Sequence, residues 1–158
     1  MANKKTAKKK TTKKSPLKSA KRKAPAKKKL TNIDHNINHN VVVWFEIPVT
    51  NIHRAAKFYS TVFGIKLNVS EMGDAKGAMF PVTRGAASGA LVQSNENKPS
   101  RDGTMIYLNG GKDLSKPLSL VEKAGGKVIQ EKMEIGEYGF IAIFEDSEGN
   151  QVALQSMS

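Results

Sequence analysis

Cysteine is absent from the 158-residue sequence. This absence excludes a disulfide framework, a thiolate metal site and a thiol nucleophile, and it is typical of proteins from a reducing compartment. No apolar run approaches the roughly 18 residues that span a bilayer, and the N-terminus lacks the apolar segment of a secretory signal. We therefore expect a cytoplasmic protein with no membrane span.

Acidic residues are absent from the first thirty positions, which hold fourteen of the 26 Lys and Arg residues. The other twelve basic residues and all 14 acidic residues lie in residues 31–158, whose charges sum to about −2. The formal net charge of +12 is thus a property of the N-terminal segment. The remaining part, about 120 residues, is long enough for one domain with its own core.

The N-terminal segment also has little to bury, because it consists mainly of Lys, Ala, Thr, Ser and Pro. Ordering it would cost backbone entropy without compensating burial, so we predict a disordered Lys-rich tail and linker at residues 1–40. Its composition resembles the tails of linker histones and histone-like bacterial proteins. A flexible cationic strand binds phosphates without sequence preference. The predicted nucleic-acid contacts are Lys8, Lys9, Lys10, Lys13, Lys14, Lys21, Arg22, Lys23, Lys27, Lys28 and Lys29.

Other interpretations of the tail stay open. A nucleic-acid tether would place the protein at a nucleoid or a nucleus, whereas a solubilising tail, a nuclear-localisation-like address or adhesion to anionic lipid would use the same charges differently. The linker carries His35 and His39 four residues apart, beside Asp34. Its Asn-rich composition disfavours the helix that a metal site there would need, so we interpret it as solvated.

After the linker the sequence changes to VVVWFEIPV, whose β-branched and aromatic residues predict a strand. Asn51 is a good N-cap, apolar residues then recur at helical spacing, and Gly64 supplies a left-handed stop. On this helix we expect Phe58 to be partly peripheral and Tyr59 and Phe63 to lie in the core. Three strand-like runs with Gly-containing turns follow, namely IKLNVSEM, GAMFPVTR and SGALVQS.

The same order repeats in the second half of the sequence. TMIYLNG predicts a strand, and Asp113 or Ser115 caps a helix that has Pro117 in its first turn and ends at Gly125-Gly126. The runs KVIQEKMEI, GFIAIFED and NQVALQS predict three more strands, the last two joined by a tight turn at residues 147–150.

This duplication of element order predicts the architecture. We expect an α+β fold in which two βαβββ modules form curved mixed sheets around a cavity. The domain occupies residues 41–158, with the first module at 41–97 and the second at 103–157.

Two stretches carry a resemblance to a known family. WFEIPVTNIHRAAKFYSTVFGIKL and GFIAIFEDSEGNQVALQS resemble the opening and closing signatures of the vicinal-oxygen-chelate superfamily. That superfamily includes glyoxalase I, bleomycin-resistance proteins, fosfomycin-modifying enzymes and extradiol dioxygenases. The resemblance extends over residues 41–157 and implies the fold, but it does not specify a reaction, since one fold hosts many activities.

In metal-dependent members of this family, each half donates two ligands, one from its first and one from its last strand. The resemblance puts the first position on Trp44 and the fourth on Ala153, with the second near residues 90–92 and the third near 104–106. Indole and alkyl side chains offer no lone pair to a divalent metal, and a Thr hydroxyl is a poor ligand. Only Gln93 stands near enough to substitute. We therefore predict no metal and no other cofactor.

The predicted ligand-binding residues are those that strand alternation allows to face the cavity. Trp44 and Glu46 share one face of the first strand. Glu46 is the best catalytic candidate, either as a proton acceptor or as the partner of a cationic ligand. In the alternative, it pairs with Arg54 or Arg84 and only supports the sheet. The remaining candidates are Gln93, Tyr107, Gln151 and Gln155.

Three functional hypotheses follow from these residues. The first is a binding module or metal-free enzyme that holds a small, partly apolar organic molecule. The second is a metal-dependent isomerase, lyase or dioxygenase whose ligands lie at other positions than those assigned above. The third is a nucleic-acid-associated protein that uses the fold for dimerisation or sensing. Whether the protein is an enzyme stays open, and a homodimer is expected from the resemblance alone.

Overall fold

The computed structural model describes residues 42–84 and 86–158, all of which belong to one compact unit. The predicted tail, with its nucleic-acid contacts and its histone-like character, lies outside the described residues. Within the described ranges, no helix is both long enough and apolar enough to cross a membrane.

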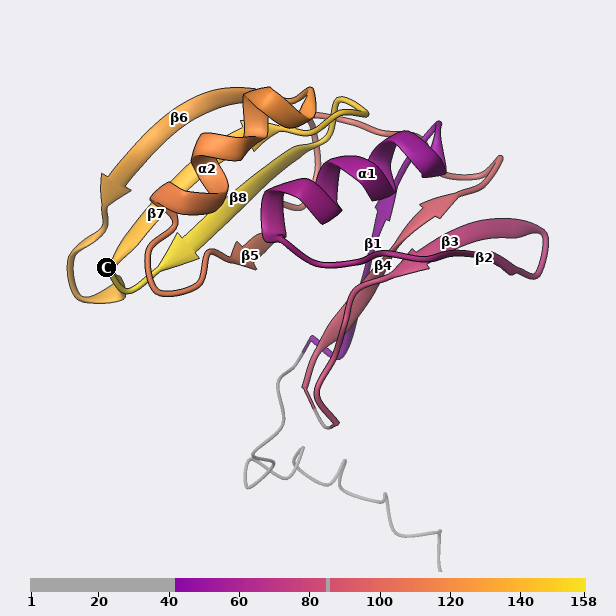
Figure 1. The fold of residues 1–158 in the computed structure, drawn as a ribbon, viewed down its shortest axis with the longest axis horizontal. Helices are drawn as coiled ribbons and strands as arrows, with labels where there is room; N and C mark the ends of the chain where they lie inside the picture. The colour runs from indigo at the N-terminus through magenta and orange to yellow at the C-terminus, as the bar shows by residue number, and fades with distance from the viewer. Residues whose placement is uncertain (1–41, 85) are drawn as a thin grey trace, which may run out of the picture. The chain divides into compact units, whose positions relative to one another are not determined.

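The secondary structure elements follow the predicted order twice (Figure 1). The first module contains β1 (Trp44–Pro48), α1 (Ile52–Phe63), β2 (Val69–Met72), β3 (Ala75–Met79) and β4 (Ser88–Gln93). The second contains β5 (Tyr107–Asn109), α2 (Ser115–Val121) with the 3₁₀ turn η1 (Glu122–Ala124), β6 (Lys127–Glu134), the 3₁₀ turn η2 (Gly136–Tyr138), β7 (Phe140–Glu145) and β8 (Gln151–Ser156). Most strands are shorter than the sequence runs that predicted them.

Each module forms one four-stranded mixed sheet, with the order β1-β4-β3-β2 in the first and β5-β8-β7-β6 in the second. The first and last strands of each module pair in parallel, and the other pairs are antiparallel. Trp44 lies beside Ser88, and Tyr107 lies beside Ala153. The predicted α+β fold with two βαβββ modules is confirmed.

Helix α1 begins and ends as its sequence predicts. The Asn51 side chain accepts a hydrogen bond from the Arg54 backbone N–H at 3.0 Å, which satisfies one of the free donors of the first turn. At the other end Gly64 adopts a left-handed conformation with φ of 63°. Helix α1 packs against α2, and Figure 1 shows both helices on one side of the sheets.

Helix α2 is shorter than predicted, because its last turn tightens into η1 before Gly125 ends it with φ of 99°. The first helical residue is Ser115, and its backbone N–H donates to the Asp113 carboxylate at 2.9 Å. Asp113 also accepts a hydrogen bond from Lys132 of β6 at 2.8 Å. These contacts hold the pKa of the Asp113 carboxyl well below its usual value, with the Lys132 hydrogen bond as the main cause.

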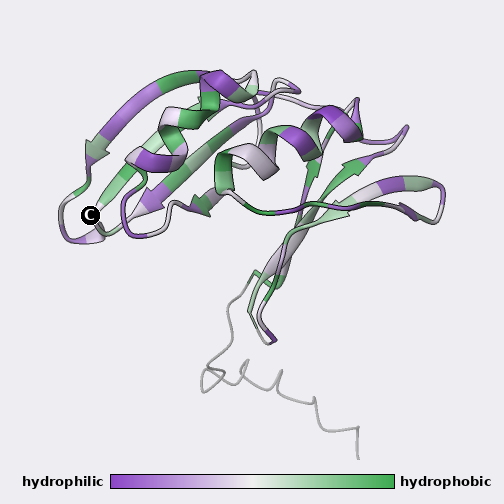
Figure 2. Cartoon of the chain, viewed as in Figure 1, coloured by the Kyte–Doolittle hydropathy of each residue, from purple (hydrophilic) through white to green (hydrophobic). Residues whose placement is uncertain are grey.

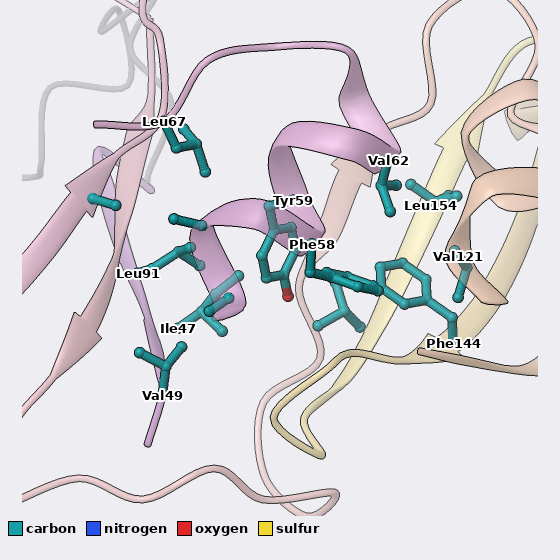
Figure 3. Close-up of a cluster of buried hydrophobic side chains, with 14 of the residues drawn as sticks. Ile47, Val49, Phe58, Tyr59, Val62, Leu67, Leu91, Val121, Phe144 and Leu154 are labelled. Atoms are coloured by element: carbon teal, nitrogen blue, oxygen red, sulfur yellow. The ribbon is translucent and has the colours of Figure 1, made fainter. Parts of the chain in front are cut away.

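The core lies between the helices and the sheets, and Figure 2 shows hydrophobic and hydrophilic segments alternating along these elements. Phe58 extends from α1 toward Phe144 of β7 with ring centroids 6.0 Å apart, so it joins the two modules (Figure 3). The prediction that Phe58 is peripheral was wrong, since its exposure is 1%. Phe63, which was expected in the core, is partly exposed instead. Phe58 is covered by Phe144 of the second module, whereas Phe63 lines the cavity described below.

Candidate functional site

The turn between β7 and β8 reaches across to the start of α1. The Glu148 side chain has no exposed surface, and its Oε2 accepts hydrogen bonds from the Thr50 and Asn51 backbone N–H groups at 3.0 and 2.9 Å and from the Thr50 hydroxyl at 2.7 Å. Arg54 completes the arrangement with Nε at 2.7 Å from Oε1 and Nη2 at 2.9 Å from Oε2. A carboxylate from the second module thus caps the first helix of the first module.

The opposite charges of Glu148 and Arg54 stabilise each other. Burial alone would raise the pKa of Glu148, but the hydrogen bonds from Arg54, Thr50 and Asn51 outweigh it and lower that pKa below its usual value. The Glu148 carboxylate in turn raises the pKa of Arg54. Both groups are therefore ionised at neutral pH, and the capped turn carries a fixed ion pair.

Asp146 and Asn150 extend the same contact into the protein. The buried Asp146 carboxylate accepts hydrogen bonds from the Tyr59 hydroxyl at 2.7 Å, from the Asn150 side chain at 2.9 Å and from two backbone N–H groups of the turn. Asn150 also donates to the carbonyl oxygen of Pro48 at 2.9 Å. Burial and the nearby Asp146 charge raise the pKa of Tyr59 well above its usual value, which keeps its hydroxyl a donor. These residues tie β8 to α1 and to the end of β1.

A cavity of about 1020 Å³ lies between the first strands of the two modules. Its walls contain six apolar side chains that are each partly exposed: Phe45, Phe63, Ile65, Phe80, Ile106 and Leu108. Trp44 and Tyr107 stand at its edge with 40% and 50% exposure, and the polar side chains are those of Glu46, Ser88, Thr104 and Asn109. The cavity is therefore a mostly apolar site with a few polar groups, as expected of a small-molecule pocket.

Trp44 and Glu46 share the face of β1 that is turned away from the core, while Ile47 and Val49 face the core. The Trp44 indole N–H donates to the Glu46 carboxylate at 3.2 Å. In residues 42–84 and 86–158 no Lys, Arg or His nitrogen lies within 4.0 Å of this carboxylate. The alternative in which Arg54 neutralises Glu46 is wrong, because Arg54 binds Glu148.

The structure brings together three of the six predicted ligand-binding residues and separates the other three, of which Gln151 lines a different hollow of about 160 Å³. Trp44, Glu46 and Tyr107 line the cavity. Gln93 does not line the cavity. Its side-chain oxygen accepts a hydrogen bond from the Ile52 backbone N–H at 2.8 Å and so caps the N-terminus of α1. Gln155 lines an adjoining hollow of about 330 Å³ that also includes Tyr107, and its amide donates to the Tyr138 carbonyl at 3.1 Å.

Sequence reasoning missed the aromatic wall of the cavity. The Phe80 ring lies 5.6 Å from both Phe45 and Tyr59, and Tyr59 stacks on Phe63 at 6.3 Å, measured between ring centroids. Phe80 follows β3 and precedes a proline, which ends the strand early and leaves this ring at the cavity edge. The Phe-Pro pair at residues 80–81 was the available signal.

The polar hollow behind Glu46 was also missed. It has a volume of about 160 Å³ and lies between the end of β1 and the segment that connects the modules. Glu46 is part of its wall, together with Lys98, Ser100, Asp102 and Thr104. Glu46 and Thr104 thus border both this hollow and the 1020 Å³ cavity.

The family's metal positions were tested against the side chains present. The resemblance puts the first position on Trp44 and the fourth on Ala153; in the structure, Ala153 lies beside Tyr107, and β4 presents Ala90 opposite Glu46. Across residues 42–84 and 86–158, no three His, Cys, Asp or Glu side chains are grouped so that they could hold a metal ion. Glu46 is the one carboxylate in the cavity wall of the described chain, and a single carboxylate does not fit the four-ligand arrangement.

Comparisons with known proteins agree with this architecture. The family model of the Glyoxalase/Bleomycin resistance protein/Dioxygenase superfamily matches residues 37–154. A "Glyoxylase-like domain-containing protein" from Didymella fabae is 32% identical over 127 residues, covering 73% of this chain and 93% of the relative.

Among solved structures, glyoxalase I from Zea mays is similar with a TM-score of 0.57 and 21% identity over 73% of this chain. The chain spans only 45% of that maize protein. TnmS3, an antibiotic binding protein from Streptomyces sp. CB03234, has a TM-score of 0.55 and 21% identity, covering 77% of this chain and 99% of its own. These similarities show the fold, while the family model and the fungal relative show the family. The chain belongs to the Glyoxalase/Bleomycin resistance protein/Dioxygenase superfamily.

Proposed function

We propose that the protein binds a small, partly apolar organic molecule in the cavity between β1 and β5, without a metal ion. The observation that carries this proposal is the composition of the cavity wall. Aromatic and aliphatic side chains from both modules surround about 1020 Å³, while the family's ligand positions hold side chains such as Trp44 and Ala153. A volume of this size accommodates a drug-sized molecule.

The similar fold of TnmS3, an antibiotic binding protein, supports a binding role. Trp44 and Tyr107 offer flat surfaces that suit an aromatic or other planar ligand, because such rings contribute large contact area with few rotatable bonds. Glu46 adds one charged group that orients the ligand or accepts a proton from it.

Ligand binding is tested by thermal-shift measurements with bleomycin and a panel of aromatic metabolites. A ligand at a hundred times its Kd stabilises the folded state by about 2.7 kcal/mol, which gives a readily measured rise in Tm. Trp44→Ala and Tyr107→Ala should abolish that rise. Tyr138→Ala is the matched control, because Tyr138 is 63% exposed and does not line the cavity. A rise that survives both cavity substitutions would contradict the assigned site.

The metal-free part of the proposal has its own test. Protein purified without chelator is examined by elemental analysis, with substoichiometric Zn, Ni, Mn and Fe expected. One tightly held metal ion per chain would favour the competing function, a metal-dependent isomerase, lyase or dioxygenase.

A second function is favoured by the charge of the tail. Fourteen cations within thirty residues that contain no acid suit a sequence-independent tether to nucleic acid. We expect the full chain to bind duplex DNA in a salt-sensitive manner and a variant without residues 1–38 to lose this binding. Binding that persists in the shortened variant would assign nucleic-acid recognition to the folded part instead.

A homodimer is part of the proposal as well. Apolar side chains that are about half exposed, such as Met79 at 51% and Met133 at 46%, occur in both modules and would be covered by a second copy. Light scattering of the full chain measures the mass directly, and a monomer at micromolar concentration would contradict this expectation.

A further inference from the structure

The geometry around Glu46 points to the chemical class of the ligand: we propose that it is an amphipathic amine, with an apolar or aromatic body in the 1020 Å³ cavity and a protonated nitrogen at the Glu46 carboxylate. This inference rests on the proposed binding function and makes it more specific. Its basis is that one carboxylate lies at the boundary between an apolar space and a polar one.

The two spaces differ in character. The larger is walled mainly by aromatic and aliphatic side chains. The smaller is lined by side chains of Lys98, Ser100, Asp102, Asn150 and Gln151, together with apolar residues of β1 and β8. Glu46, Thr104 and Ile106 line both spaces, so a molecule that extends from the larger into the smaller passes the Glu46 carboxylate.

The Glu46 carboxylate has unused capacity for hydrogen bonds. Ionised carboxylates offer about four acceptor sites, and the hydrogen bonds found in the described residues use one, from the Trp44 indole at 3.2 Å. That bond holds Oε1 at the N–H edge of the indole and leaves the other acceptor sites of the carboxylate free. A protonated amine supplies the missing donors and the opposite charge.

Lys98 is the group that would favour an anionic ligand instead. It lines the small hollow only, and Asp102 lines the same hollow, so its charge is balanced locally. Glu46 and Asp102 carry two negative charges and Lys98 carries one positive charge, so the hollow has a net charge of about −1. The sum of charges next to the large cavity is therefore negative, which selects a cationic head group over a carboxylate.

The test uses three probes with one shared naphthalene body: 1-naphthylmethylamine, 1-naphthylmethanol and 1-naphthoic acid. Their Kd values for the full chain are measured at pH 7 by isothermal titration calorimetry. Because Glu46 is an exposed residue, we expect the amine to bind about two- to fivefold more tightly than the alcohol, the range of an exposed ion pair, and the acid to bind more weakly than the alcohol.

Glu46→Gln should remove the preference for the amine over the alcohol, because Gln keeps the shape and the acceptor for Trp44 but loses the charge. Glu71→Gln is the matched control, since Glu71 is an exposed glutamate of β2 that does not line the cavity. It should leave all three affinities unchanged. The ratio of the alcohol Kd to the amine Kd in the unmodified protein tests the proposal independently of any variant.

The outcomes are distinguishable. Equal binding of amine and alcohol, or an amine preference that persists in Glu46→Gln, overturns this inference and leaves the binding function intact. Tightest binding of the acid also overturns it, and would assign head-group recognition to Lys98. Absence of binding by all three probes counts against the cavity as a binding site for aromatic molecules and so overturns both proposals.

Discussion

Replacing Glu148 with Gln removes one charge from the contact between the two modules while nearly preserving side-chain shape. The carboxylate has no exposed surface, and its donors come from the turn before α1, from Arg54 and from the neighbouring Ser147 hydroxyl. The amide of Gln can still accept hydrogen bonds from the Thr50 and Asn51 backbone through its oxygen. Its NH₂ group, however, then faces the Arg54 guanidinium, so that donors oppose donors.

The size of the effect follows from how much of the ion pair is covered. Breaking a fully buried pair costs about 3–5 kcal/mol, and an exposed pair contributes at most about 1 kcal/mol. Glu148 is covered, whereas the Arg54 side chain is 53% exposed and stays solvated after the substitution. We therefore expect Glu148→Gln to lower the free energy of unfolding by about 2 kcal/mol, which corresponds to a fall in Tm of about 5–10 °C.

The same ion pair predicts a pH dependence. Hydrogen bonds keep the pKa of Glu148 in the folded protein below its usual value of 4.5. Its stabilisation is therefore fully present above about pH 4.5 and is lost as the pH falls through the lower folded-state pKa. The difference in stability between the unmodified protein and Glu148→Gln should be constant from neutral pH down to that point and shrink below it.

Urea denaturation followed by circular dichroism measures both effects. Glu145→Gln is the matched control on the same hairpin, since Glu145 contacts Arg101 at 3.3 Å with both side chains partly exposed, and a loss below about 1 kcal/mol is expected there. In a double-mutant cycle, Arg54→Met should cost little once Glu148 is already Gln. A loss of less than about 0.5 kcal/mol for Glu148→Gln at pH 7 would refute the reasoning.

Three further predictions concern single contacts. Tyr59→Phe removes the donor to the buried Asp146 carboxylate, so the free energy of unfolding measured in urea should fall by about 1.5–3 kcal/mol, and an unchanged value would contradict the network. Gly126→Ala places a Cβ 2.5 Å from a backbone oxygen and 2.8 Å from an aromatic ring of α1, so a loss of about 1–3 kcal/mol is expected, and wild-type stability would show that the modules separate easily. In a carbon-13 NMR titration, Asp113 should titrate below its usual 3.8, and Lys132→Ala should raise the midpoint; an unmoved midpoint would exclude that ammonium as the main cause.

Local signals in the sequence were sufficient to predict most of the elements. Asn51 and Gly64 marked the ends of α1 correctly, because capping depends on the residue itself and on its nearest neighbours. The duplicated order of elements followed from turns and hydrophobic periodicity, which are equally local. Alternation also placed Trp44 and Glu46 on one face of β1.

Contacts between the two modules could not be predicted from these local signals. Phe58 looked peripheral on an isolated helix, yet it is buried because α2 and β7 of the other module cover it. Gln93 was assigned to the cavity because strand alternation allows it to face inward, and the structure uses that side chain to cap α1. Alternation could not exclude it, because β4 is buried on both faces and its pattern does not show which face meets the cavity.

The candidate site itself is a product of the contact between modules. Its walls come from β1, the end of α1 and the residues after β3 in one half, and from β5 and the residues before it in the other. Asn150, at the start of β8, holds the carbonyl oxygen of Pro48 two residues beyond Glu46, while β8 pairs with β5. The hydrogen bonds of one turn therefore connect the strand that carries Glu46 to the strand that carries Tyr107. A change in that turn should alter ligand affinity as well as stability, although none of its side chains lines the 1020 Å³ cavity.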